Sequence, residues 1–206
     1  MSSESTSHLA SQTVGGFLQS LSAKVPTPGG GAAAAITGAT ACATAGMVLS
    51  YSIDKKSLAE HRGFNQDAKN RLDELRAMFL QLAEDDAAGY GVLNTMWKLA
   101  KDHPDRIAGW DAAVAGAIEP PRVMLARAVE LLELCVELIS TTNKQLKSDL
   151  GVAAVLGQAA ARSAAWNIRI NIPLLPESSH AGWHTAVDTL LAQAQTLCQE
   201  IKAGCS

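Results

Sequence analysis

An acidic run at residues 84–86, in the segment LAEDDAAGY, is the first place where side chains could carry out acid–base chemistry. In a helix, Asp86 follows Leu82 by four residues and shares its apolar face, whereas Asp85 points away. Tyr90, four residues further on, lies on the same face. A carboxyl group held against such a face has a raised pKa and can exchange protons near neutral pH. Acidic runs also occur simply as solvated surface, and the pattern alone leaves both interpretations open.

A glycine-rich stretch, PTPGGGAAAA, precedes a long run without charge. Three glycines follow Pro28: Gly29, Gly30 and Gly31. They lead into a predicted helix whose first amides have no intrahelical partner and can receive a carboxylate or carbonyl of a ligand. They could equally let a neighbouring helix cross close to the chain. Neither a dinucleotide-binding loop nor a Walker loop fits, because no hydrophobic strand precedes the glycines and no Gly-Lys-Ser/Thr follows.

Other polar side chains interrupt apolar helical segments. In TTNKQLKSDLGVAA, Asn143 falls at a helix end, and Ser148 or Asp149 can cap the helix that follows. Asn167 and Asn171 are four residues apart on a strongly apolar helix, where asparagine is poorly favoured. Buried amides require hydrogen-bond partners, and the ring nitrogens of a ligand would provide them.

Histidines and cysteines do not form a recognisable metal or catalytic site. His180 and His184 have helical spacing but no acidic ligand beside them, so we interpret them as exposed residues at a helix start. The four cysteines are dispersed without a CxxC pair, which argues against zinc and disulfides and favours a reducing, cytoplasmic location. We expect no metal ion and no cofactor.

The composition argues against two classes of partner. Charged residues make up 18% of the 206 residues, the formal net charge is −3 and no Lys/Arg cluster is present, so no nucleic-acid partner is expected. Residues 29–53 are free of charge and long enough to cross a bilayer, but Ala, Gly and Thr gain little from hydrocarbon. We expect a helix buried in a soluble bundle, without membrane association.

Helical periodicity dominates the chain, and no segment alternates as a strand bounded by hairpin turns. With only 4% aromatic residues, the sequence predicts an all-α bundle of about six or seven closely packed helices in one domain, residues 13–206. Residues 1–12 are expected to be a frayed or disordered tail, not a signal peptide. The prolines at 120 and 121 are expected to end a helix over 107–118 and separate it from one ending near Thr142. The other predicted helices are 14–23, 29–53, 57–99, one from Ser148 or Asp149 to Pro173, and 181–203.

Five segments occur in an order typical of one known family: PTPGGGAAAA, MVLSYSIDKK, DDAAGY, NKQLKSDLGVAA and SAAWNIRIN. From about Phe17 to Asn171 the chain resembles the formiminotetrahydrofolate cyclodeaminase/methenyltetrahydrofolate cyclohydrolase family. The resemblance implies an all-helical homodimer with a folate one-carbon substrate bound close to the subunit interface. Its members hydrolyse 5,10-methenyltetrahydrofolate to 10-formyltetrahydrofolate, or close 5-formiminotetrahydrofolate with release of ammonia. We expect the cyclohydrolase, because the sequence has no formiminotransferase domain to supply a cyclodeaminase.

The resemblance also implies roles for individual residues. Asp86 and Asp149 match acidic positions of the family and would stabilise the amidinium-like methenyl cation, with either one as the proton carrier. Lys56 would hold the glutamate tail of the folate or the developing oxygen. The residues implied in substrate binding are Pro28, Gly29, Gly30, Gly31, Tyr90, Asn143, Ser148, Asn167 and Asn171.

Three positions depart from the family pattern. Asp54 stands before the lysine pair where the family has Gly, Leu58 replaces an aromatic residue, and Thr142 stands where Gly commonly precedes the asparagine. These departures bear on the lysine pair and on substrate fit. The alternatives are a cyclodeaminase and a non-catalytic helical dimer that binds folate or a protein. The presence of both Asp86 and Asp149 argues for an enzyme.

Overall fold

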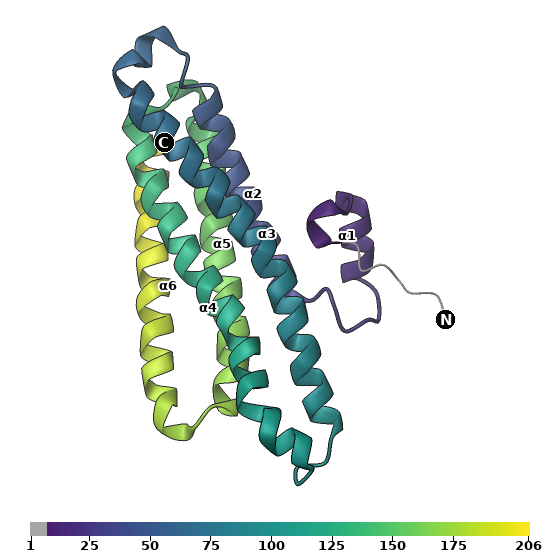
Figure 1. Ribbon diagram of the computed structural model, residues 1–206. Coiled ribbons are helices and arrows are strands. Elements are labelled where there is room, and N and C mark those ends of the chain that lie inside the picture. Colours follow the sequence, from purple (N-terminus) through teal and green to yellow (C-terminus); the bar gives the residue numbers. More distant parts are fainter. Residues whose placement is uncertain (1–7) are drawn as a thin grey trace.

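The computed structural model describes residues 8–206, and this part of the chain consists of helices and turns without a strand. Five long helices run side by side, and a short one, α1, is set apart from them (Figure 1). The all-α bundle is thereby confirmed. The α-helices are α1 (Val14–Leu21), α2 (Gly30–Ser50), α3 (Arg62–Lys98), α4 (Pro104–Thr141), α5 (Lys147–Asn171) and α6 (Glu177–Cys205). Short 3₁₀ turns cover Leu9–Ser11, Lys56–His61, Lys144–Leu146 and Ile172–Leu174.

Small side chains build much of the core. The helices α2, α3, α4 and α5 form a ring in which each packs against two neighbours, and α6 covers α4 and α5. Buried alanines are frequent in α2 and α5, so the helix backbones approach closely. Because α6 packs against α4 and α5 and has no comparable contact with α2, no other long helix among residues 8–206 covers the outward face of α2 and α5.

The helix α2 is also the one helix of the described chain that is long and apolar enough to cross a membrane. Its mean hydropathy is 1.6 in the most apolar 18-residue window, and 61% of that window is buried inside the bundle. We interpret α2 as a core helix, because its apolar surface is already occupied by neighbouring helices.

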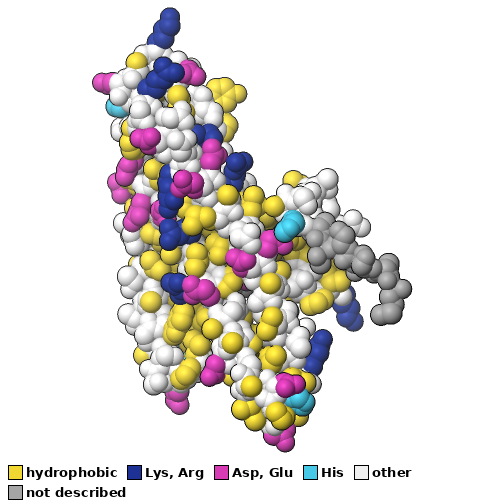
Figure 2. All heavy atoms as spheres, viewed as in Figure 1, with side chains coloured by type: hydrophobic (Ala, Val, Ile, Leu, Met, Phe, Trp, Pro, Cys, Tyr) yellow, Lys and Arg dark blue, Asp and Glu magenta, His cyan; other side chains and the backbone are white. Residues whose placement is uncertain are grey.

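Charges of both signs alternate along α3 and α4. Arg71 of α3 and Arg127 of α4 both pair with Glu130, and Arg71 also pairs with Glu74. Figure 2 shows Lys and Arg next to Asp and Glu on this face, without a large patch of one sign. A nucleic-acid backbone would require a continuous positive surface, which this face does not offer.

The N-terminal segment touches the bundle through few residues. Leu9 and Phe17 are buried, and the backbone N–H of Leu9 donates to the Glu84 carboxylate of α3. Part of the expected frayed tail, Leu9–Ser11, thus forms a 3₁₀ turn on the bundle. Residues 1–7 lie outside the described part of the chain.

The helix α4 differs from the predicted pair of helices. It runs unbroken from Pro104 to Thr141 with Pro120 and Pro121 inside it, so the predicted break was wrong. A proline in a helix interior removes one hydrogen bond and crowds the carbonyl four residues earlier, at a cost of about 3 kcal/mol. Both proline rings are buried where α4 packs against α3 and α5. This tertiary packing outweighs the local preference.

Two predicted helix starts also shift. The helix α3 begins after Ser57, because a 3₁₀ turn intervenes in which Leu58 has non-helical dihedral angles. The helix α5 begins at residue 147, so Ser148 and Asp149 lie inside its first turn and do not cap it. Asn143 is the capping residue of this junction, where its side chain accepts a backbone N–H two residues on.

Candidate active site

A pocket of about 520 Å³ opens where the start of α2, the second half of α3, the middle of α4 and the end of α5 meet. Its walls combine polar side chains with apolar and aromatic ones, as in most small-molecule sites. Of the residues selected from the sequence, seven line it: Gly29, Gly30, Gly31, Asp86, Tyr90, Asn167 and Asn171. Pro28 precedes these glycines and is half-buried, but it is not among the lining residues.

Asp86 is placed in this pocket by α3 and lies against the first turn of α2. A Cβ added at Gly31 would lie 2.1 Å from Asp86 Oδ1, so only glycine leaves room for the carboxyl group. Burial raises the pKa of Asp86 to about 6. The positive end of α2 favours the ionised form, but burial prevails in setting the direction. The pocket therefore holds a carboxyl group suited to proton transfer near neutral pH.

Asn167 and Asn171 present acceptors to the same pocket. Asn167 Nδ2 donates to Ser163 O at 3.0 Å, and Asn171 Nδ2 donates to Asn167 O at 2.9 Å and to Ala117 O at 3.5 Å. Because each amide nitrogen faces a helix carbonyl, the Oδ1 atom on the other side of each amide remains for a ligand. Asn167 Oδ1 lies beside Gly30, where an added Cβ would be 3.6 Å from it. Two amide oxygens and one carboxyl group thus favour a ligand rich in N–H donors or positive charge.

An aromatic pair on α3 forms another wall. Tyr90 and Trp97 are in edge-to-face contact, with ring centroids 6.2 Å apart and an angle of 71° between the planes. Both rings remain partly exposed and line the pocket, so they can stack on a flat heteroaromatic ligand. Sequence reasoning missed Trp97, although it follows Asp86 by eleven residues, three helical turns, and thus shares its face.

The loop before α2 contributes residues that sequence reasoning also missed. Pro26 and Thr27 line the pocket in front of the glycines. Loops of this kind often shape binding sites on a rigid scaffold. Their position directly before the glycine run would have indicated this role from the sequence.

The remaining predicted site residues lie at the opposite end of α5. Asn143 accepts from Lys55 Nζ at 2.5 Å, and its backbone N–H donates to Ser52 Oγ at 2.9 Å. Lys55 makes this contact. Lys56, for which the family resemblance implied a role toward the substrate, is exposed.

The two ends are well separated along α5. Asp149 and Asn167 are eighteen positions apart, which corresponds to about 27 Å of helix. Lys56, Asn143, Ser148 and Asp149 are therefore not brought to the Asp86 pocket within one chain.

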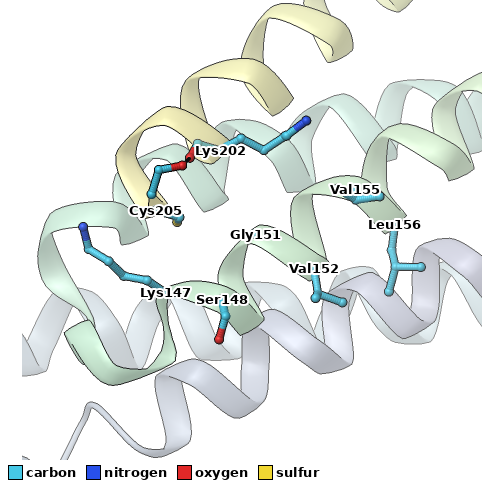
Figure 3. A pocket seen from close by; sticks show the side chains of 9 residues that line it. Lys147, Ser148, Gly151, Val152, Val155, Leu156, Lys202 and Cys205 are labelled. Carbon is cyan, nitrogen blue, oxygen red and sulfur yellow. Dashed lines mark hydrogen bonds between the residues drawn. The ribbon is translucent and has the colours of Figure 1, made fainter.

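Ser148 lines a separate, open pocket of about 400 Å³ near the chain's C-terminus. Figure 3 shows Lys147 and Ser148 at the start of α5, with Val152 and Leu156 following along the helix and Lys202 on α6. Lys147 Nζ donates to Gly204 O at 2.7 Å, which ties the start of α5 to the end of α6. This second pocket is mainly apolar and holds no carboxyl side chain among its lining residues.

Comparison with known proteins places these features in context. The profile of the formiminotransferase-cyclodeaminase family matches residues 13–187. A methenyltetrahydrofolate cyclohydrolase of Methylorubrum extorquens is 29% identical over 195 residues, which cover 92% of this chain and 94% of that protein. A formimidoyltransferase-cyclodeaminase of Gallus gallus is 23% identical over 168 residues, 80% of this chain but only 31% of the chicken protein.

The fold has a solved counterpart as well. The crystal structure of a formiminotetrahydrofolate cyclodeaminase from Thermotoga maritima superposes with a TM-score of 0.86. The superposition covers 95% of this chain and 96% of that one at 23% identity. The family resemblance inferred from the sequence motifs is confirmed.

Proposed function

The chain belongs to the formiminotransferase-cyclodeaminase family, and from this premise we propose that it is a methenyltetrahydrofolate cyclohydrolase. The observation that carries the proposal is the half-buried carboxyl group of Asp86, with a pKa raised to about 6, in a pocket walled by aromatic rings and amide oxygens. The match to the Methylorubrum cyclohydrolase over nearly the full length of both chains supports this choice over the cyclodeaminase.

The pocket suits the charge and shape of the proposed substrate. In 5,10-methenyltetrahydrofolate the one-carbon unit bridges N5 and N10 as an amidinium-like cation. A carboxylate beside this carbon stabilises the positive charge and can accept a proton from an attacking water. The pterin ring would stack on Tyr90 and Trp97, and its N–H edge would donate to the oxygens of Asn167 and Asn171.

In the proposed reaction, Asp86 alone accepts and returns the proton. Asp86 takes a proton from water as the water oxygen bonds to the methenyl carbon, which gives a tetrahedral carbon bearing a hydroxyl group. The protonated Asp86 returns that proton to N5 as the carbon–N5 bond breaks. The hydroxyl group loses its proton as the formyl C=O forms on N10, so each turnover releases one proton.

A homodimer is the second part of this proposal. On the uncovered face of α2 and α5, large apolar side chains of α5 are exposed to solvent. Their exposed fractions lie between 49% and 75% for Val152, Val155, Trp166 and Ile170. Exposed apolar patches of this kind mark interfaces. Two copies packed in opposite directions across this face would bring the Asn143 and Asp149 end of one chain to the Asp86 pocket of the other. Both groups of predicted residues would then serve one site.

The function is tested by offering both family substrates to the purified protein. Accelerated loss of 5,10-methenyltetrahydrofolate, followed by its near-ultraviolet absorbance, without ammonia release from 5-formiminotetrahydrofolate is the expected result. Ammonia release alone would favour the cyclodeaminase. Folded protein that acts on neither substrate would favour a non-catalytic binding dimer.

A further inference from the structure

The prolines inside α4 leave two backbone carbonyls without their usual helical partners. Pro120 and Pro121 have no N–H, so the carbonyls of Gly116 and Ala117, four residues earlier, receive no hydrogen bond from them. Carbonyls in a packed interior need other partners. Each of the two meets a different neighbour, and only one of them borders the pocket.

The Gly116 carbonyl faces the backbone of α3 outside the pocket. A Cβ added at Gly89 would lie 2.3 Å from Gly116 O, so the two helices are in backbone contact there. Neither glycine lines the pocket. The carbonyl freed by Pro120 therefore serves helix packing.

The Ala117 carbonyl, in contrast, meets a binding-site amide. It accepts from Asn171 Nδ2 at 3.5 Å, while the same nitrogen donates to Asn167 O at 2.9 Å. Ala117 and Asn171 both line the pocket. The Asn171 amide nitrogen thus faces backbone carbonyls on two helices, at 2.9 Å on α5 and at the longer distance of 3.5 Å on α4. This fixes which end of the amide can face a ligand.

We propose that Pro121 is a positioning residue for ligand recognition: by withholding an N–H from Ala117 O, it leaves that carbonyl to orient Asn171 with Oδ1 toward the ligand. Any other residue at 121 would supply the N–H of a regular helix and compete for this carbonyl. The inference deepens the proposed function, on which it rests for the identity of the ligand: the N–H edge of a pterin ring.

Two alanine variants test the proposal as a matched pair. P121A restores a donor to Ala117 O, whereas P120A restores one to Gly116 O, which Asn171 does not use. Loss of one oriented hydrogen bond predicts that P121A raises KM for 5,10-methenyltetrahydrofolate about three- to tenfold, with kcat changed less than about twofold. P120A should leave KM within about twofold. Equal KM increases in both variants would overturn the proposal, because they would report a general change in α4.

A second substitution separates positioning from a merely structural effect. In an N171A background, P121A should raise KM no further, since the amide it acts on is gone. An undiminished effect of P121A in N171A would contradict the inference. P121S restores the same N–H and replaces P121A in every measurement if P121A does not fold.

A ligand-free measurement makes the inference independent of the proposed activity. In ¹H–¹⁵N spectra, the Asn171 side-chain NH₂ signals should shift in P121A and not in P120A. An inactive wild type with this shift would reject the cyclohydrolase while supporting the positioning. Unchanged Asn171 signals in P121A would overturn the positioning even if the enzyme is active.

Discussion

The carboxyl group of Asp86 rests on the backbone of Gly31, so closely that a methyl group at residue 31 would lie 2.1 Å from Oδ1. This contact joins two motifs that are far apart in the sequence, the glycine run at the start of α2 and the acidic run in α3. The glycines are required here by a side chain from another helix. The carboxyl group in turn lies at the N-terminus of α2, where the free backbone amides can also receive a ligand.

Substitution G31A should displace the Asp86 carboxyl group. A contact of 2.1 Å cannot be tolerated, so Asp86 must change rotamer and lose its place. We expect kcat/KM to fall at least about tenfold with little change in helix content by circular dichroism.

The control for this variant is G63A. Gly63 is also the second residue of its helix, α3, and an added Cβ there meets nothing within 4 Å. Activity in G63A should remain within about twofold of the wild type. Equal losses in G31A and G63A would show that the Gly31–Asp86 contact is not the cause.

Replacement of Asp86 by Asn should remove the proton carrier. For a true general base we expect kcat to fall about a hundredfold or more. D85N is the matched control, because Asp85 is exposed and, among residues 8–206, its side chain accepts a hydrogen bond only from Gln81 on its own helix. A loss of less than about threefold in D86N would exclude Asp86 as the base.

The pH dependence follows from the direction of the Asp86 pKa. Burial raises this pKa from 3.8 to about 6, and the proposed base must be ionised. We therefore expect kcat/KM of the wild type to fall as the pH drops through about 6. A flat profile from about pH 5 to 7.5 would contradict this assignment.

The contribution of Asp86 to the unfolding free energy should fall as the pH rises, whereas kcat/KM should rise. The raised pKa stabilises the folded protein below the unfolded-state value of 3.8, and this stability is lost as the pH rises through about 6. D86N has no carboxyl group to ionise in the pocket, so it avoids the free-energy cost of that ionisation. The unfolding free energy of D86N should equal that of the wild type at about pH 4 and exceed it by on the order of 2 kcal/mol at about pH 7.5. Denaturant unfolding at both pH values measures the difference.

Mixing two inactive variants tests whether the site is shared between chains. If Asp86 of one copy works with Asp149 of the other, a mixed D86N/D149N dimer contains one intact site and one doubly altered site. With random exchange, activity should return to about a quarter of the wild-type value. A mixture with no more activity than its components would place Asp149 outside the Asp86 site.

Several site residues could be predicted because local periodicity controls them. The helical phase of Leu82 and Asp86 predicted an inward carboxyl group, and the spacing of Asn167 and Asn171 predicted two amides on one face; all three polar residues line the pocket. The glycine run was correctly read as a helix start. Each of these inferences depends on residues within one or two turns of one helix.

Features that depend on contacts between helices could not be predicted in this way. The continuity of α4 through Pro120 and Pro121 comes from packing against α3 and α5, which local preference opposes. The need for glycine at residue 31 arises from the side chain of Asp86, which belongs to the next long helix of the chain. The contact between Lys55 and Asn143 joins the turn before α3 to the junction before α5, and no local pattern indicates it.

Hydrolysis of the methenyl bridge by Asp86 can be measured directly. Wild type and D86N are mixed separately with 5,10-methenyltetrahydrofolate, and the loss of absorbance is compared with the uncatalysed reaction. We predict a clear acceleration by the wild type that D86N reduces about a hundredfold or more. A wild-type rate equal to the uncatalysed rate would show that the protein is not a cyclohydrolase, and equal acceleration by both proteins would show that Asp86 does not carry the proton.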